Sequence, residues 1–210
     1  LNYQSDKNSQ LISLDKIRDN EQNLAAELEK NNKKRNEIVK AVKKAIEDEI
    51  KALEKLKKAK FALTPEGIAM SKSFNKNKGR LIWPVERGEI ASKYGRHQHH
   101  LVTTAFVDNN GVDITTSKNA NVRAVFEGKV TSVLIIPGAG RVVMVSHGEY
   151  RTVYANLQEV YVKKGDQVKA KDKLGKLLAK ESGISESHFE IWRILASGMS
   201  TVNPSFWLSK

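Results

Sequence analysis

The side chains best able to do chemistry in this chain are imidazoles and carboxylates, because the sequence has five histidines and no cysteine. Without cysteine no thiolate metal site can form. His97, His99 and His100 lie in one short segment, and clustered histidines can bind a metal ion. The alternative is a polar loop exposed to solvent. His147 precedes a glycine, which is typical of a hydrogen-bonded turn residue, although a ligand role stays open.

Two further sets of polar side chains fall on common faces of strands. Alternation of period two gives the sets His188, Glu190 and Trp192 on one strand, and Asn109, Gly111 and Asp113 on another. A trough of amides, one acid, one imidazole and an exposed indole suits an amphipathic helix or a peptide, for which tryptophan is a favoured anchor. Arg193 and Asn110 would line its rim. Alternatively, Trp192 is a core residue packed under the sheet.

Helical periodicity dominates the first sixty residues. Between Leu11 and Phe61 apolar residues recur at helical spacing and neither glycine nor proline occurs, which predicts one long helix or a helical pair. The polar segment 31–35 interrupts the stripe, so the helix either crosses it in solvent or turns there. An apolar stripe on a charged rod needs a partner surface, as in a coiled coil, or it packs onto the chain's own domain.

A shorter helix should begin at Thr64 and Pro65, since threonine can cap free N–H groups and proline suits the first turn. It would run to about Phe74, and the residues that follow are typical of a polar linker. This helix comes just before the next domain and carries apolar side chains. We therefore hypothesise that it lies over the trough and restrains it.

From about Leu81 the pattern changes to short runs rich in β-branched residues and separated by glycine turns, which predicts an all-β domain of antiparallel strands. The predicted strands span 121–126, 129–136, 141–146, 151–155, 173–178 and 187–194. The fold class is therefore α+β. We expect a helical coiled-coil arm over 1–63, a short helix and linker over 64–80, and the β-domain over 81–210.

The formal net charge of +12 favours an acidic partner. Lys and Arg are spread over both halves, without the Arg-rich arm or the basic stretch with interleaved aromatics of a nucleic-acid binder, so nucleic acid is not an expected partner. No window reaches the length of a membrane span or of a signal-peptide core. Because the chain begins with Leu1 rather than Met, we expect residues to precede it in the full protein.

Segments of the β-domain resemble the motifs of lysostaphin-type (LytM-like) zinc peptidases, in the same order and with the same spacing. The matching segments are 83–85, 94–97, 111–114, 154–157, 162–168, 186–190, 203–204 and 207–208. The resemblance implies a LytM-type domain of duplicated hybrid motifs. It also implies chemistry that needs three protein ligands on Zn²⁺, one open position for water and an orienting histidine.

The residues of that chemistry are only partly kept. Asn109 stands where the resemblance implies the first zinc ligand, Asn156 where it implies a catalytic histidine, and Glu186 where it implies the first histidine of a His-x-His pair. Asp113 and His188 remain, and we expect them to hydrogen-bond each other across neighbouring strands. Because two protein ligands do not make a tight zinc site, we expect zinc and catalysis to be lost, with no cofactor.

The arm and the degenerate domain together are similar to EnvC-like murein hydrolase activators, most clearly at 109–114, 123–126 and 188–192. The resemblance implies that the vacant groove binds a peptidoglycan amidase and relieves its autoinhibition in daughter-cell separation. The expected groove residues are Asn109, Asn110, Asp113, Asn156, His188, Glu190, Trp192 and Arg193. It further implies that the arm connects to an FtsEX-like membrane division complex, that peptidoglycan is a further partner, and that the protein is exported to the periplasm or cell envelope.

Two other functions stay open. An active zinc-dependent peptidoglycan endopeptidase would use Asp113, His188 and a rescuing histidine, and would degrade cell wall without a partner in a chelator-sensitive way. A passive wall-binding module would bind peptidoglycan and stimulate nothing. An activator would stimulate an added amidase.

Overall fold

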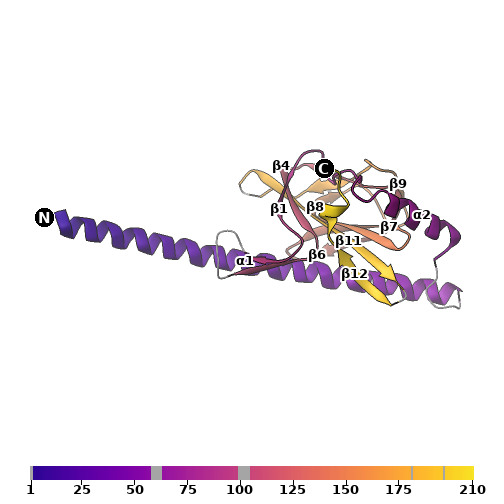
Figure 1. Ribbon diagram of the computed structural model, residues 1–210, viewed down its shortest axis with the longest axis horizontal. Helices are drawn as coiled ribbons and strands as arrows, with labels where there is room; N and C mark the ends of the chain where they lie inside the picture. The colour runs from indigo at the N-terminus through magenta and orange to yellow at the C-terminus, as the bar shows by residue number, and fades with distance from the viewer. Residues whose placement is uncertain (1, 58–62, 99–104, 181, 196) are drawn as a thin grey trace.

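The computed structural model describes residues 2–57, 63–98, 105–180, 182–195 and 197–210, and it confirms the α+β class: a long helix precedes an antiparallel β-domain (Figure 1). The helices are α1 (Asn2–Lys57) and α2 (Pro65–Lys76), with a 3-10 turn at Pro204–Phe206. The strands are β1 (Glu89–Ser92), β2 (Gly95–Gln98), β3 (Phe106–Asn109), β4 (Val112–Ser117), β5 (Asn121–Arg123), β6 (Gly128–Ile136), β7 (Gly140–His147), β8 (Tyr150–Val160), β9 (Gln167–Val168), β10 (Lys173–Leu177), β11 (Ile184–Leu195) and β12 (Gly198–Val202).

One large sheet forms the body of the domain. Its strand order is β1-β4-β11-β8-β7-β6-β9, with β12 beside β11 and with β10 joining β5 to β8, while β2 and β3 form a separate hairpin. The predicted strand 121–126 is shorter, because the backbone N–H of Ala124 bonds to Asp172 and that of Val125 bonds to the Tyr154 hydroxyl. The neighbouring strands β4, β11 and β8 bring together segments that are far apart in the sequence.

The sheet carries an apolar core on each face. Along β7, Val143 and Val145 belong to one cluster while Val142 and Met144 belong to another. Because successive residues of a strand point to opposite faces, these clusters lie on opposite sides of the sheet. The first cluster includes Phe74 of α2, and the second includes residues of α1.

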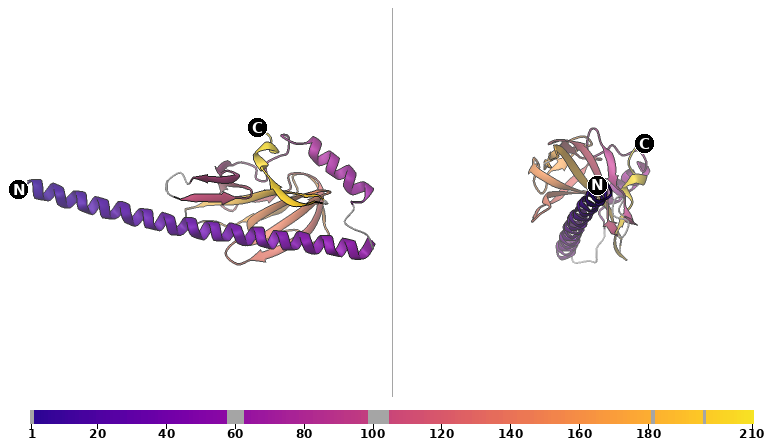
Figure 2. Two further views of the ribbon diagram at one scale, coloured as in Figure 1. Left: turned by 60° about the horizontal axis from the view of Figure 1, so that its bottom comes forward. Right: turned by 90° about the vertical axis from the view of Figure 1, so that its left-hand side faces the viewer.

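Helix α1 is one continuous helix, so the alternative of a helical pair is wrong. One part of it lies along the sheet and the N-terminal part projects beyond the domain (Figure 2). Ile38, Val42 and Ile46, which we call the seam, are buried and share one face through their four-residue spacing. Leu11 and Leu14 in the projecting part are 51% and 61% exposed. The apolar stripe therefore packs onto the chain's own domain over only part of its length.

Helix α2 begins as predicted, with the Thr64 side chain accepting a hydrogen bond from a backbone N–H of the first turn. The Phe74 ring stacks on His147 and Tyr150, with ring centroids 4.7 and 4.9 Å apart. Gly148 has φ +80, and a Cβ there would collide with the α2 backbone, so the close contact requires glycine. Since α2 is held on the face opposite α1, the hypothesis that it covers the trough is wrong.

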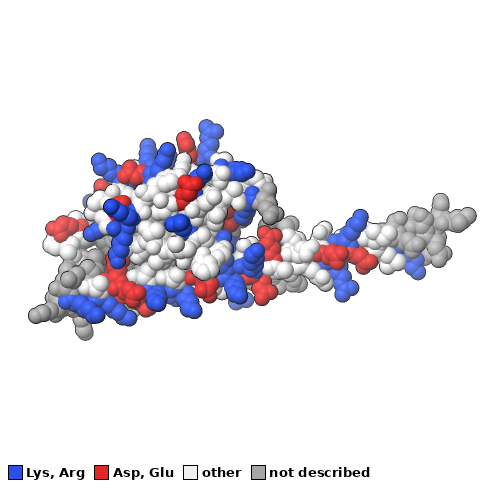
Figure 3. All heavy atoms as spheres, turned by 180° about the vertical axis from the view of Figure 1, so that it is seen from behind, with Lys and Arg blue, Asp and Glu red and all other residues white. Residues whose placement is uncertain are grey.

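The surface carries charges of both signs. Acidic and basic side chains are interspersed along α1 and over the face of the domain in Figure 3, so the net charge of +12 is not gathered into one patch on that face. Among the described helices, none combines the length and the hydropathy needed to cross a membrane.

Candidate functional site: a polar cluster covered by helix α1

The floor of the site is a chain of hydrogen bonds along β4 and β11. The two strands pair with Asp113 directly opposite His188, whose Nδ1 lies 2.6 Å from the carboxylate, so the predicted bond is confirmed. The other ring nitrogen, Nε2, lies 2.9 Å from Glu190. The second carboxylate oxygen of Glu190 accepts a hydrogen bond from the Trp192 indole at 2.6 Å. All four side chains are buried.

His188 is held as an imidazolium between two carboxylates. Burial alone lowers the pKa of an imidazole, but the charge and hydrogen bonds of Asp113 and Glu190 outweigh it and raise the pKa of His188 to about 10. Burial raises the pKa of Asp113, whereas His188 and Arg35 lower it by more, so this pKa lies below its ordinary value. Both ring nitrogens of His188 thus face carboxylate oxygens of the protein, at 2.6 and 2.9 Å.

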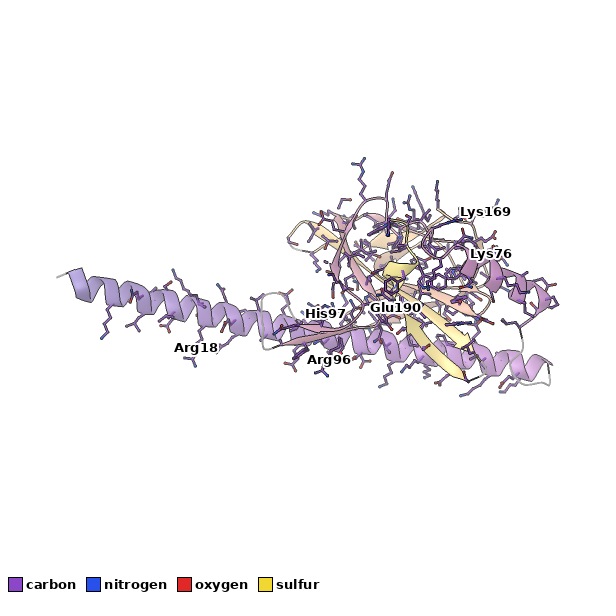
Figure 4. All side chains as sticks on the ribbon, viewed as in Figure 1. Arg18, Lys76, Arg96, His97, Lys169 and Glu190 are labelled. Carbon is purple, nitrogen blue, oxygen red and sulfur yellow. The ribbon has the colours of Figure 1, made fainter. Side chains whose placement is uncertain are left out.

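The donor set does not fit the zinc ion that the family resemblance implies. Asn109 donates from its amide to Asp113 at 3.2 Å and accepts from the Gly111 N–H at 3.0 Å, so the protein uses both ends of the amide. Across the described residues, no three histidine or acidic side chains are grouped so that they could hold a metal. His97 lies on the hairpin beside α1, with Nδ1 3.1 Å from the carbonyl of Gly95 (Figure 4).

The remaining histidines offer no ligand set either. His99 and His100 lie outside the described residues. His147 is buried against α2, with Nδ1 2.6 Å from the carbonyl of Glu127 and Nε2 2.8 Å from the Thr152 hydroxyl. Burial lowers the pKa of His147 to about 3, which keeps the ring neutral. The interpretation of His147 as a hydrogen-bonded structural residue is therefore confirmed.

Asn156 and Glu186 border the same small space as Asp113 and His188. The Asn156 backbone has φ 66, in the left-handed region that asparagine tolerates better than most residues. Its Nδ2 donates to the carbonyl of Glu186 at 3.1 Å, while its Oδ1 is buried without a hydrogen-bond partner. The Glu186 carboxylate lies 3.0 Å from Lys180. The structure thus brings together the residues at both vestigial catalytic positions.

Arg35 of α1 closes this space from the other side. Its Nη2 lies 2.5 Å from the Asp113 carboxylate and 3.5 Å from the Ser92 hydroxyl. The cavity that remains is about 10 Å³, close to the room one water molecule needs. Asn31 and Lys34 also line it, and burial lowers the pKa of Lys34. The polar segment that interrupts the apolar stripe therefore stays helical and faces the site.

A second ion pair lies further along α1. Arg151 of β8 is buried, with a side chain only 2% exposed, and its guanidinium contacts both carboxylate oxygens of Glu49 at 2.6 and 3.2 Å. The same guanidinium donates to the carbonyls of Gly148 and Tyr150 at 2.6 and 2.9 Å. Between the two ion pairs the seam packs on the apolar cluster that contains Trp192. We call the sheet face beneath α1, from Asp113 to Arg151, the groove.

Two predicted groove residues require correction. Trp192 is on the groove face but is 1% exposed under α1, so it is not an exposed anchor in this state. Arg193 is wrong as a rim residue, because alternation along β11 turns it to the opposite face, where it lies 5.7 Å from the Tyr150 ring and 3.5 Å from Glu149. Asn110 lies between β3 and β4 and is half-buried.

Sequence reasoning did not predict that α1 supplies part of the site. Arg35, Glu49 and their partner Arg151 were not among the candidate residues. The available signal was spacing: Arg35 precedes Ile38 by three positions and Glu49 follows Ile46 by three, so both lie on the face of the seam. Charged residues are common on helix surfaces, which hides such a signal.

Comparison with known proteins agrees with this architecture. Residues 107–204 match the sequence profile of peptidase family M23. The β-domain resembles the M23 peptidase domain. An uncharacterized metalloprotease of Haemophilus influenzae is 35% identical over 119 residues, which are 54% of this chain and 25% of that protein. A peptidoglycan DD-endopeptidase of Vibrio cholerae is 32% identical over 111 residues, 51% of this chain and 25% of that protein.

A solved structure shares the fold of this β-domain. Helicobacter pylori Csd3 superimposes with a TM-score of 0.50 at 24% identity, over 62% of this chain and 33% of that one. The matched part of the chain spans only about a quarter of each relative named above. The likeness therefore concerns the domain, and the arm lies largely outside it.

Proposed function

We propose that this protein is a non-catalytic activator of peptidoglycan amidases in daughter-cell separation, and that it binds the amidase through the groove. The observation that carries the proposal is the polar cluster itself. His188 is committed to two carboxylates, and Asn109 and Asn156 hold the positions where the family resemblance implies a ligand and a catalytic histidine. In such a cluster both ring nitrogens of His188 already face carboxylates, and an asparagine stands where the resemblance implies a catalytic histidine.

In this state the groove is already filled. Arg35, the seam and Glu49 occupy its length, so an amidase reaches it only when α1 moves away. The proposal therefore includes a closed state, in which α1 lies on the sheet, and an open state that activates. The projecting part of α1 is a suitable binding segment for an FtsEX-like membrane complex, because its apolar side chains Leu11, Ile12, Leu14 and Ile17 are exposed within the described part of the chain. The peptidoglycan DD-endopeptidase among the relatives supports a place in the periplasm or cell envelope.

The test compares the parent protein with an opened one. Val42→Asp places a carboxylate in the seam, which burial disfavours, so α1 should detach from the sheet. Asn36→Asp makes the same change of charge at an exposed position of α1 and is the matched control. Each protein is mixed with dye-labelled peptidoglycan, with and without a purified peptidoglycan amidase of low basal activity.

We expect no dye release by any of the three proteins alone, and amidase stimulation by Val42→Asp that exceeds the parent and the control. Failure of the opened protein to stimulate any amidase would contradict the proposal. The endopeptidase alternative is favoured by the names of the relatives and by the retained Asp113 and His188. It predicts dye release without amidase that a chelator abolishes.

A further inference from the structure

The two ends of the groove carry buried charges of opposite sign. Asp113 and Arg151 belong to the β-domain and have side chains 3% and 2% exposed, whereas their partners Arg35 and Glu49 on α1 are 13% and 20% exposed. Each ion pair is therefore buried chiefly on the domain side. When α1 leaves, the domain keeps an acid at one end of the groove and a base at the other.

The matching pattern on α1 has a fixed spacing. Arg35, Ile38, Val42, Ile46 and Glu49 follow one another every three or four residues and so form one stripe. The charged residues are 14 positions apart, which is roughly 21 Å along a helix. From its N-terminal end, the stripe consists of one basic residue, three branched apolar residues and one acidic residue.

Detachment of α1 leaves both buried charges without their partners on α1. An unpaired buried charge is strongly unfavourable, whereas an apolar surface of this kind accepts many side chains. Arg151 keeps its bonds to two carbonyls but loses both contacts to a carboxylate. Asp113 keeps His188 and Asn109 but loses its guanidinium. A new occupant that supplies a cation and an anion at these points replaces what α1 removes.

We propose that the groove selects a partner helix that copies the stripe of α1: a basic side chain against Asp113, branched apolar residues over the Trp192 cluster, and an acidic side chain against Arg151 about four turns away. This inference rests on the proposed function and specifies the amidase segment that is bound. The partner thus competes with α1 for the same two charges. An apolar helix without these charges is a poor ligand, because it would bury Arg151 without a carboxylate and Asp113 without its guanidinium.

Peptides allow the charges of the ligand to be changed while the receptor stays the same. The probe is a fluorescent synthetic peptide of residues 28–54, and the receptor is the full chain with Val42→Asp, measured by fluorescence anisotropy. Peptides with Arg35→Glu or Glu49→Lys should bind roughly tenfold or more weakly than the parent peptide, because each places like charges together in a desolvated contact.

Exposed positions of the same peptide provide matched controls. Lys40→Glu and Glu47→Lys repeat the two changes of charge at exposed positions on the outer face of α1, and both peptides should bind within about twofold of the parent. In a receptor that also carries Asp113→Asn, the penalty of the Arg35→Glu peptide should disappear, since the side chain keeps its shape and loses its charge. Equal binding of all five peptides to the Val42→Asp receptor would overturn the inference.

A final arm connects the peptides to the amidase. The parent peptide should block stimulation of the amidase by the Val42→Asp protein, and the Arg35→Glu and Glu49→Lys peptides should not. If the two charge-reversed peptides blocked stimulation as well as the parent peptide does, the proposed selection by charge would be contradicted. If the Val42→Asp protein stimulates no amidase, the proposed function fails. The anisotropy data would still decide whether the groove selects peptides by their charges at the two ends.

Discussion

Asp113 is a buried carboxylate, and such a group requires compensating positive charge. In this protein the compensation comes from His188 and from Arg35, while Asn109 adds an amide N–H. A guanidinium from a distant helix thus neutralises a position where the family resemblance implies a metal ion. Asp113, His188 and Asn109 are thus held by hydrogen bonds and ion pairs that the protein itself supplies.

The raised pKa of His188 predicts a loss of stability in alkali. Its folded value of about 10 lies above the ordinary 6.5, so its contribution is fully present below pH 6.5 and is lost as the pH rises through about 10. We expect the free energy of unfolding in urea to fall by an amount on the order of a few kcal/mol between these limits. In His188→Gln the fall should be much smaller. Parallel pH profiles for the two proteins would show that His188 is not charged in the fold.

The sequence allowed the Asp113–His188 bond to be predicted, because the two residues lie in motifs whose strands are neighbours. It did not allow the role of Arg35 to be predicted. The spacing from Ile38 that places Arg35 on the face of the seam applies almost equally to Lys34, and the contact of Arg35 to Asp113 joins residues 78 positions apart. The same holds for Trp192 and Arg193. Alternation along the strand predicts that they lie on opposite faces of the sheet, but it does not predict which face α1 covers.

The two helices have different roles: α2 packs into the core on one face of the sheet, and α1 covers the groove on the other face. Short-range signals placed α2 correctly, because capping by Thr64 and the position of Pro65 act within one turn. The face on which α2 lies depends on contacts with β7 and β8, which no local signal encodes. Phe74 decides that face, since its ring inserts between His147, Tyr150 and Trp207. Helix α2 is therefore an anchor of the core.

Truncation of this anchor should weaken the domain without opening the groove. Phe74 is fully buried, and Phe74→Ala should lower the free energy of unfolding by about 3–5 kcal/mol. Ile68→Ala, at a side chain 45% exposed, should change it by no more than about 0.5 kcal/mol. Urea unfolding gives both values. Limited proteolysis should find α1 still protected in the folded Phe74→Ala protein, and early cleavage within the seam would indicate that α2 also holds α1.

At the scale of the whole molecule, the chain is a rod fastened to a domain at two charges and one apolar seam. The fold class and the order of arm, short helix and β-domain could be predicted from periodicity, because helical and strand patterns differ over tens of residues. The docking of the rod onto the sheet could not, since an apolar stripe fits equally well against another chain. The ion pairs of Arg35 with Asp113 and of Glu49 with Arg151 are what fix α1 to its own domain rather than to another chain.

The absence of cysteine makes the position of the rod measurable. Arg18→Cys and Lys169→Cys place spin labels on the projecting part of α1 and on the β-domain (Figure 4). We expect a narrow distribution of distances between the labels in the parent and in Asn36→Asp. Val42→Asp should broaden it, because a released helix samples many orientations. A distribution as narrow as that of the parent would mean that the seam does not hold the rod.

The 14-residue interval between Arg35 and Glu49 also determines how the rod can leave. A slide by one turn in one direction would set Asn31 against Asp113 and Ala45 against Arg151, and a slide in the other direction would set Val39 against Asp113. Either shift breaks both ion pairs together and restores neither. A slide by one turn is therefore unfavourable at both ends of the groove, and we expect α1 to lift off the sheet rather than slide along it. In the proposed function, release of α1 would then be an all-or-none event without half-open positions.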